Sequence, residues 1–547
     1  MSLTFKRHYK LLVLLVLLLI SLVLGLGSQR IIAYTVPGDL SVLAAASTFE
    51  NQVALFDEST VHAIQIIISD NEYQQMITTY QQTGEKDYFH ADVIIDGVRV
   101  DNVGLRLKGN ASLRTALGGM GGGGMAGRLP FNEIVPGEGQ EGDLPQFDPE
   151  NMPGFDQDGN QFQFDPGNRP GFDQDGALPQ LNPDELPDFG QRGAAPGGRV
   201  RPEGALPNMP AGEQMARAGG GMGQNTQIPL LIKFDEFVSG QSYQGYTRLA
   251  IRSAGISYDA AMLQEPITNS VFRLAGLPAA QTAYAGVQMN GEAEQLFVIS
   301  EVIDETYLEN YFTNPGGVLY KAELNATMSY QGEDPSAYAS SFTQETRRKE
   351  ADFAPLIAFL RFISESDEAT FASQLPEYLD VDSFAAYLAI NNLLVNTDSM
   401  AGMGNNFYFY YDDVSGRMTV LYWDGNESLS RLGGGATYDL YFQGGSGLGG
   451  RMGGGSNQLI NRFLGNPTFK ALYEAKLQQV YQQAFLGGAI EAQIDAYASV
   501  ILQANQGRAL VDPTSYEQAV AEVRDFISQR EAYLSNTTLL GGGISQP

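Results

Sequence analysis

The segment from residue 117 to residue 226 limits the fold of this chain most, because it cannot supply part of a hydrophobic core. It is dominated by Gly, Pro, Asp and Gln, and it contains no Lys, Tyr or Trp and almost no β-branched residues. A segment of this composition buries too little apolar surface to offset the entropy that is lost on ordering. We therefore predict a disordered insertion here, so that every folded unit is built from residues on either side of it.

Residues 1–30 carry the pattern of an export signal. Lys6, Arg7 and Lys10 precede the apolar run 11–26, as a basic flank precedes the apolar core of such a signal. At ~1.5 Å per residue, the run approaches the thickness of a bilayer core. Because no small-residue cleavage site follows directly, a cleaved signal peptide and a retained membrane anchor both stay open. Either one predicts a secreted or cell-surface protein.

Composition excludes several functional classes. The formal charge of -30 argues against nucleic acid as the main partner, because such binding needs a basic surface. The chain has no Cys, and its three histidines, His8, His62 and His90, all lie near the N-terminus. Catalytic triads, thiolate nucleophiles and histidine metal sites are therefore excluded from the rest of the chain. The carboxylates and amides that remain there suit a hard cation such as Mg²⁺.

Both flanks of the insertion carry strands and helices. Residues 48–116 form a small unit with alternating apolar positions, and its Asp96-Gly97 pair predicts a tight hairpin turn. Residues 227–540 begin with strands and end with helices. We expect strands or hairpins at 61–68, 91–100, 103–110, 229–234, 283–303 and 406–423, and helices at 72–80, 263–275, 381–397, 468–485, 489–504 and 514–534.

Three polar residues should meet at the second hairpin of the later part. Asp398 follows the predicted helix 381–397, Asn406 precedes an aromatic strand, and Asp424 follows the next strand. In an antiparallel hairpin the first residue of one strand lies opposite the last residue of the other, so these side chains should converge. Such a set suits phosphoryl transfer, with one Asp handling the hydroxyl proton and an Asn and an Asp holding a metal. Capping of ordinary turns explains the same residue types, and both interpretations stay open.

The order of short motifs resembles the spore-coat CotH kinase family. Each motif is weak alone, but together they run in family order from residue 104 to residue 424. The matching pieces are Gly104-Leu105-Arg106-Leu107-Lys108-Gly109-Asn110-Ala111-Ser112, Met262-Leu263-Gln264-Glu265, Gly276-Leu277-Pro278-Ala279, Tyr284-Ala285, Asn290-Gly291, Glu301-Val302-Ile303-Asp304, Leu319-Tyr320-Lys321, Asn391 to Ser399, Asn406-Phe407-Tyr408 and Trp423-Asp424. The chain departs from the family at Asn405, where a His is usual, and at Ala111 and Gln264, which replace Ser and Arg.

The resemblance implies a fold, an activity and three site residues. The fold is α+β, an atypical protein-kinase-like core in 227–540 with a helical C-terminal subdomain and a small β-rich N-terminal unit. The activity is metal-dependent transfer of the γ-phosphate of ATP to Ser or Thr of surface or extracellular proteins, with Mg²⁺ or Mn²⁺. Asp398 is the implied catalytic residue, and Asn406 and Asp424 are the implied metal ligands.

The side chains that contact the nucleotide are not singled out by the sequence. A phosphate needs a cation, and that cation needs a carboxylate to orient it. The candidate cations are Arg106, Lys108, Lys233, Arg252 and Lys321, and the candidate carboxylates are Glu265 and Glu301. The glycine-rich stretch 118–124 is not a phosphate loop, because the Walker pattern is absent.

The partner and two other functions follow from the same features. An acidic enzyme favours a protein substrate whose Ser or Thr lies in a basic segment. Nucleic acid is not expected as a partner, and the membrane is contacted through residues 1–30 if these are uncleaved. The first alternative is a catalytically silent surface or matrix protein that keeps the fold as a binding module. The second is a carbohydrate-binding surface protein, which requires exposed rings in the aromatic strand 407–411.

Overall fold

The structure is a computed structural model, which describes residues 47–109, 113, 116–117, 227–253, 260–324, 326–402, 404–429, 435–441 and 457–541. The export signal predicted for residues 1–30 therefore lies outside the described residues, as does the insertion after residue 117. Among the described helices, none alone has the length and apolar character to cross a membrane. The bent pair Pro467–Leu486 and Ala489–Arg508 meets those criteria when taken together.

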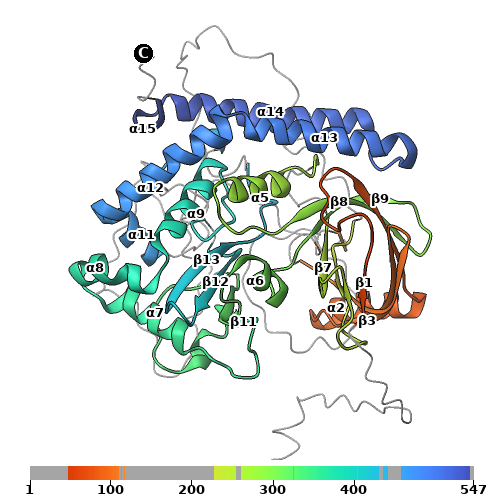
Figure 1. Cartoon of the computed structure of the whole chain (residues 1–547), viewed down its shortest axis with the longest axis horizontal. Helices are drawn as coiled ribbons and strands as arrows, with labels where there is room; N and C mark the ends of the chain where they lie inside the picture. Colours follow the sequence, from red (N-terminus) through yellow and green to blue (C-terminus); the bar gives the residue numbers. More distant parts are fainter. Residues whose placement is uncertain are drawn as a thin grey trace, which may run out of the picture. The chain divides into compact units, whose positions relative to one another are not determined.

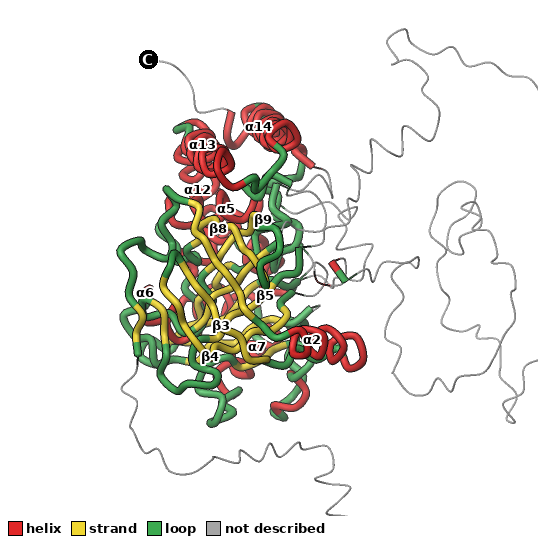
Figure 2. The backbone as a smooth tube through the Cα atoms, turned by 90° about the vertical axis from the view of Figure 1, so that its right-hand side faces the viewer, coloured by secondary structure: helices red, strands yellow, loops and turns green. Residues whose placement is uncertain are grey.

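Seven strands form a closed barrel in the order β2-β3-β4-β5-β7-β9-β8 (Figure 2). The strands are Val61–Ile67 (β2), Phe89–Ile95 (β3), Val98–Leu107 (β4), Leu230–Lys233 (β5), Arg248–Arg252 (β7), Thr282–Met289 (β8) and Gln295–Ser300 (β9). Alternate residues point inward, as the complete burial of Ile64 and Ile66 in β2 shows. Residues 48–116 and the first part of 227–540 therefore share one barrel core.

The barrel closes across the insertion. β4 precedes the insertion and β5 follows it, yet the two strands pair antiparallel, with Leu107 opposite Leu230. Beyond the strand end, the backbone N–H of Lys108 donates a 2.9 Å hydrogen bond to the carbonyl of Pro229. The hairpin turn between β3 and β4 is at Asp96 and Gly97, which both have positive φ, as a two-residue turn of this kind requires.

Two smaller sheets and a set of helices complete the described fold (Figure 1). Thr48–Phe49 (β1) pairs with Ser242–Tyr243 (β6), and a four-stranded sheet has the order β11-β10-β12-β13. Its strands are Val318–Ala322 (β10), Phe342–Gln344 (β11), Phe407–Asp412 (β12) and Arg417–Tyr422 (β13). The helices are Asp70–Thr83 (α2), Gln264–Leu274 (α5), Glu305–Tyr311 (α6), Ala354–Glu365 (α7), Glu368–Tyr378 (α8), Val381–Leu393 (α9), Gln458–Gly465 (α11), Pro467–Val480 (α12), Ala489–Arg508 (α13), Pro513–Ser535 (α14) and Thr538–Gly541 (α15), with short helical turns at Pro335–Tyr338, Gly435–Thr437 and Tyr481–Leu486.

Helix α9 is the central element of the helical half. It packs against α12 and β13 (Figure 1), and every residue from Ser383 to Leu393 is buried. The helix begins at an N-cap, where Asp380 accepts a hydrogen bond from the backbone of Ser383. It ends at Leu393, four residues before the end predicted from the pattern, because Val395 takes a positive φ of 49°. The chain therefore leaves the helix early, and Asp398 lies in a loop.

Candidate functional site

The hairpin of β12 and β13 brings Asn406 and Asp424 to one edge. Phe407 pairs with Tyr422 across the two strands, so the residue before β12 and the residues after β13 leave the sheet together. Asn406 has a φ of 56° and Asp424 a φ of 63°. Asn and Asp tolerate this left-handed conformation better than other side chains do. Asn and Asp at these two positions therefore fit the left-handed backbone conformation, and their side chains also carry oxygen atoms that can bind a cation.

Asp398 lies against Asn406. Its Oδ2 accepts a hydrogen bond of 2.7 Å from Nδ2 of Asn406. The backbone N–H of Asp398 donates to Oδ1 of Asn396 at 3.2 Å, and Nδ2 of Asn396 donates to Oδ1 of Asn391 at 2.8 Å. Both of these amides are buried. The loop that carries Asp398 is therefore held to α9 by a chain of buried amide groups.

The carboxyl group of Asp398 is close to other acids. The pKa of Asp398 is raised to about 7, mainly by burial and also by the charges of Asp424 and Glu427, while hydrogen bonds from Asn405 and Asn406 act in the opposite direction. Like charges that crowd one another favour a cation between them. The electrostatics of this edge therefore suit a bound metal ion.

Arg252 joins the same edge to the barrel and to α5. It is the last residue of β7, and its Nε lies 2.5 Å from Oε2 of Glu265, the second residue of α5. Its Nη2 donates to Oδ1 of Asp424. The side chains of Arg252 and Glu265 are only 8% and 4% exposed, and that of Asp424 is 25% exposed. Burial raises the pKa of Glu265, and Arg252 offsets part of that rise.

Lys108 approaches this cluster from the end of β4. Its Nζ lies 4.8 Å from the ring centroid of Trp423, and the guanidinium carbon of Arg252 lies 5.3 Å from the same centroid. The pKa of Lys108 is lowered to about 7, mainly by burial and also by the charge of Arg252, while Asp424 and Glu265 act in the opposite direction. Two cations thus lie near one indole ring, and Arg252 also contacts two carboxylates.

The remaining candidate cations and Glu301 have other partners. Nζ of Lys233 lies 2.7 Å from Glu236, and Nζ of Lys321 lies 3.5 Å from Glu323. The charge of Lys321 nevertheless acts on Lys108. The Arg106 guanidinium lies over the ring of Tyr88 at 5.2 Å. Glu301 accepts hydrogen bonds of 3.1 Å from Gln281, Asn310 and Tyr311. The structure therefore brings together Lys108, Arg252 and Glu265 with Asp424, and Asp398 with Asn406.

The oxygen atoms of this edge fit a hard cation. Nδ2 of Asn406 is the atom that donates to Asp398, which leaves its Oδ1 to accept or to coordinate. Oδ1 of Asp424 accepts a hydrogen bond from Arg252, and its Oδ2 is a second oxygen that could coordinate a cation. Within the described ranges no group of three His, Cys, Asp or Glu residues forms a metal cage. Proteins usually bind Mg²⁺ through one or two carboxylates together with water and substrate phosphates.

Two residues of this cluster were not identified from the sequence. Trp423 is the single Trp of the chain and contacts two cations, and its position directly before Asp424 was the available signal. Asn405 hydrogen-bonds to Asp398, and its Oδ1 is buried without a hydrogen-bond partner. A buried polar atom that lacks a hydrogen-bond partner calls for an explanation, and this one lies next to a candidate catalytic carboxylate.

The aromatic strand β12 offers no platform for sugars. Phe407, Tyr408, Phe409 and Tyr410 are each 5% exposed or less. A stacking surface needs alternate rings to face solvent. The carbohydrate-binding alternative therefore loses the feature on which it depended.

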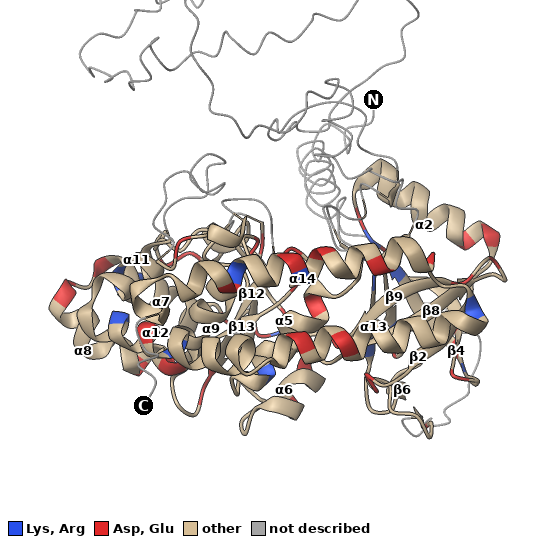
Figure 3. Ribbon diagram, turned by 90° about the horizontal axis from the view of Figure 1, so that it is seen from above, with Lys and Arg blue, Asp and Glu red and all other residues tan. Residues whose placement is uncertain are grey.

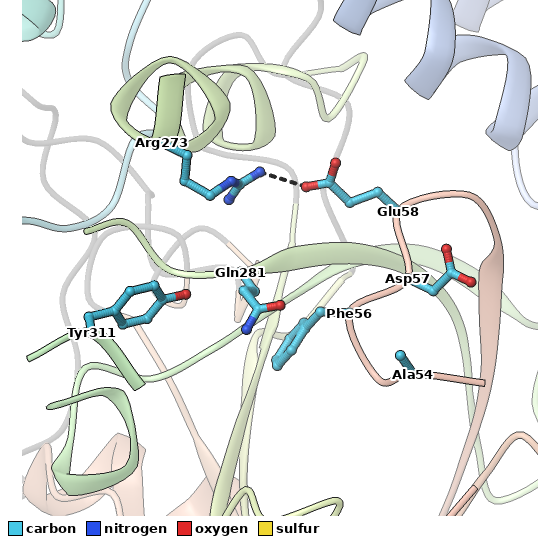
Figure 4. A pocket seen from close by; sticks show the side chains of 7 residues that line it. All are labelled: Ala54, Phe56, Asp57, Glu58, Arg273, Gln281 and Tyr311. Carbon is cyan, nitrogen blue, oxygen red and sulfur yellow. Dashed lines mark hydrogen bonds and ion pairs between the residues drawn. The ribbon is translucent and has the colours of Figure 1, made fainter. Parts of the chain in front are cut away.

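A separate pocket lies at the other end of α5 (Figure 4). It has a volume of about 570 Å³ and is lined by Ala54, Phe56, Asp57, Glu58, Arg273, Gln281 and Tyr311. Nη2 of Arg273 pairs with Oε1 of Glu58 at 2.6 Å. The lining includes none of the residues of the Asp398–Asp424 edge.

Comparisons with known proteins indicate the family of this chain. A family model described as CotH kinase protein matches residues 217–534. The inner spore coat protein H of Bacillus subtilis (strain 168) is 23% identical over 294 residues, which is 51% of this chain and 75% of that protein. One solved structure also aligns with this chain, a complex of HipA, HipB and operator DNA from the toxin–antitoxin system of Shewanella oneidensis MR-1. The TM-score is 0.26 and the sequence identity is 15%. The alignment covers 52% of this chain and 58% of the solved chain. That alignment spans less than two thirds of the solved chain.

Proposed function

Since this chain belongs to the CotH kinase family, we propose that it transfers the γ-phosphate of ATP to a Ser or Thr hydroxyl of another protein in a metal-dependent reaction. One observation supports this most directly. Asp398 is hydrogen-bonded to Asn406, and Asp424 leaves the same hairpin edge bound to Arg252. Phosphoryl transfer depends mainly on positioning and charge stabilisation, and this arrangement supplies groups for both.

Asp398 is the residue proposed to act on the hydroxyl. Its Oδ2 is oriented by Nδ2 of Asn406, and Asn405 also hydrogen-bonds to the carboxyl group. The remaining lone pairs of this carboxylate are proposed to accept a hydrogen bond from the incoming hydroxyl group. A base in this position orients the nucleophile and takes its proton. The chain of amides from Asn391 through Asn396 keeps the loop, and so this carboxylate, in place.

Asn406 and Asp424 are the residues proposed to hold Mg²⁺ or Mn²⁺. When bound, the ion supplies positive charge that neutralises the phosphate oxygens. Arg252 orients the carboxylate of Asp424 and is itself oriented by Glu265. The pair of Arg252 on a strand and Glu265 on a helix resembles the strand Lys and helix Glu of ordinary protein kinases.

The substrate and the location belong to the same proposal. The net charge of -30 favours a substrate whose Ser or Thr lies among basic residues. The export pattern at residues 1–30 favours a secreted or surface protein. A relative named as an inner spore coat protein is consistent with a surface-associated role.

A transfer assay on the full chain tests the proposal. Labelled ATP, Mg²⁺ or Mn²⁺ and a basic protein such as histone are incubated with the wild type and with Asp398→Ala, Asp424→Asn and Asp413→Asn. We expect the first two variants to lose at least about a hundredfold in rate. Asp413 lies at the opposite end of the same hairpin and is 45% exposed, so Asp413→Asn should match the wild type.

The alternative function predicts a different result. If the wild type neither transfers phosphate nor binds Mg·ATP by calorimetry, the chain is a silent binding module and the proposed function is wrong. If it transfers phosphate and Asp398→Ala retains the full rate, the activity belongs to another site.

A further inference from the structure

We propose that Lys108, held on the indole of Trp423, is the side chain that contacts the nucleotide phosphates, and that Arg252 is a positioning residue for Asp424. This inference rests on the function proposed above and divides the work between two cations that the sequence could not separate. Trp423 then has a role of its own, as the surface that holds Lys108 in place.

Arg252 is already bound on two sides. Its Nε faces Glu265 at 2.5 Å and its Nη2 binds Asp424, and the side chain is 8% exposed. A phosphate could engage this guanidinium fully only by displacing a carboxylate. Because both carboxylates already contact this largely buried guanidinium, that displacement is unfavourable. The geometry instead suits Arg252 to fixing the direction of the Asp424 carboxylate.

Lys108 differs from Arg252 in the contacts of its charged group. An ammonium group carries three donors, and among the described residues its Nζ has the ring of Trp423 as its contact, at 4.8 Å, with no ion pair. Burial lowers the pKa of this group, as do the charges of Arg252 and Lys321, whereas the charges of Asp424 and Glu265 act in the opposite direction. A half-buried ammonium group that other cations repel is stabilised by an anion. The triphosphate of the proposed nucleotide is such an anion.

Trp423 positions Lys108. The indole is 7% exposed and packs edge-to-face against Tyr408 at 6.2 Å, so its orientation is set by two neighbouring strands. An indole face is the best aromatic partner for a cation. The backbone of Lys108 is fixed as well, through its hydrogen bond to Pro229. Backbone and ring together therefore hold the ammonium next to the residue that precedes Asp424.

Calorimetric titration of the full chain with Mg·ATP and with adenosine tests this assignment. We expect Lys108→Met to weaken Mg·ATP binding at least about tenfold, a loss of ~1.4 kcal/mol, while adenosine binding is unchanged. Lys108→Arg should restore most of the affinity. Trp423→Leu should weaken Mg·ATP binding more than Trp423→Phe does. Lys476→Met removes a surface lysine that pairs with Asp382 and should bind as the wild type does.

Arg252→Met should behave differently from Lys108→Met. We expect its KM for ATP to stay within about threefold of the wild type, while kcat falls and more Mg²⁺ is needed for half-maximal rate. Thermal melting of each variant shows whether it is folded, and Lys108→Gln replaces Lys108→Met if the latter is not.

The outcomes separate the two proposals. Equal Mg·ATP affinity in the wild type and Lys108→Met, with loss of binding in Arg252→Met, overturns the inference alone. A wild type that binds no Mg·ATP overturns the proposed function, and the inference with it.

Discussion

Gly425 follows Asp424 directly and has no room for a side chain. A Cβ at this position would lie 1.8 Å from the hydroxyl oxygen of Tyr422 and 3.0 Å from Cβ of Thr268. The ring of Tyr422 stacks on Phe272 at 4.2 Å, and both rings are buried. The packing of α5 against the hairpin thus leaves only a glycine next to the proposed metal ligand.

Gly425→Ala should therefore destabilise the protein and lower its activity. Forcing a methyl group into packed surroundings costs about 1–3 kcal/mol, and the displacement begins one residue from Asp424. Urea unfolding measures the first effect and the transfer assay the second. Gly465→Ala is the control, because a Cβ there meets nothing within 4 Å. Equal stability of the two variants would contradict the close packing at Gly425.

Asp304 makes stability depend on pH in an unusual direction. Burial raises its pKa to about 6 from an ordinary value of 3.8, although Arg248 lowers it. The folded state therefore holds this proton more tightly than the unfolded chain does. The stabilisation is complete below the unfolded pKa and is lost as the pH rises through the folded pKa.

Asp304→Asn should remove that loss. Asp304 is the N-cap of α6, where its Oδ1 accepts from Thr306 and Tyr307, and Asn caps equally well. As the pH rises from about 4 to 6, the free energy of unfolding of the variant should increase by roughly 2–3 kcal/mol relative to that of the wild type. Denaturant melts across this range measure the difference. Asp367→Asn is the control of opposite sign, because hydrogen bonds to Thr370 lower the pKa of Asp367.

The site residues differ in how far the sequence could locate them. Asn406 and Asp424 follow from the register of one hairpin, because both lie within a few residues of its ends. Lys108, Arg252 and Glu265 come from β4, β7 and α5, and no local pattern shows that these elements meet. Five cations were therefore equal candidates from the sequence, and the closure of the barrel distinguishes them.

At the scale of elements, the end of α9 depends on a single buried side chain of α14. Arg530 is 0% exposed and donates to the carbonyls of Asn392, Leu393, Ala436 and Tyr438 at 2.7–3.1 Å. A cation at a helix C-terminus satisfies its free carbonyls and complements its dipole. Arg530 thus ties the helix that leads to Asp398 to the segment that follows Asp424.

Arg530→Met should lower the free energy of unfolding by about 3 kcal/mol or more, because it leaves several buried carbonyls without donors. Arg530→Lys should recover part of the loss. Arg524→Met is the matched control, since Arg524 is a partly exposed residue of the same helix and pairs with Glu491 and Asp495. Figure 3 shows acidic residues along both α13 and α14. An exposed pair contributes about 0–1 kcal/mol. Equal losses in Arg530→Met and Arg524→Met would contradict the role of Arg530.

The same contact explains why the sequence misplaced the end of α9. The apolar pattern continues through Leu394 and Val395, and both are buried, so periodicity alone extends the helix. The stop has a tertiary component, because Arg530 of α14 donates to the carbonyls of Asn392 and Leu393 at the end of the helix. Likewise the second strand of the hairpin expected at 91–100 and the strand expected at 103–110 form one continuous strand, β4, which pairs with β3 on one side and β5 on the other.

At the scale of the whole molecule, the barrel contains strands from both sides of the insertion. We expect that replacing residues 118–226 with a short Gly-Ser linker leaves the melting temperature within a few degrees of the wild type, because β4 and β5 keep their pairing. Extending the deletion through residue 234 removes β5 and should abolish cooperative unfolding. Circular dichroism melts compare the three chains. A large loss in the first deletion would show that the insertion contributes to the core.

The hydrogen bond between Lys108 and Pro229 also bears on how this family can diversify. Closing a flexible loop costs a free energy that grows only with the logarithm of its length, about 0.6 kcal/mol for each doubling. Chains with the same barrel can therefore lengthen, shorten or exchange the sequence between these two residues at almost constant stability. Homologous chains should then vary in length at this junction far more than at the Asp96-Gly97 turn.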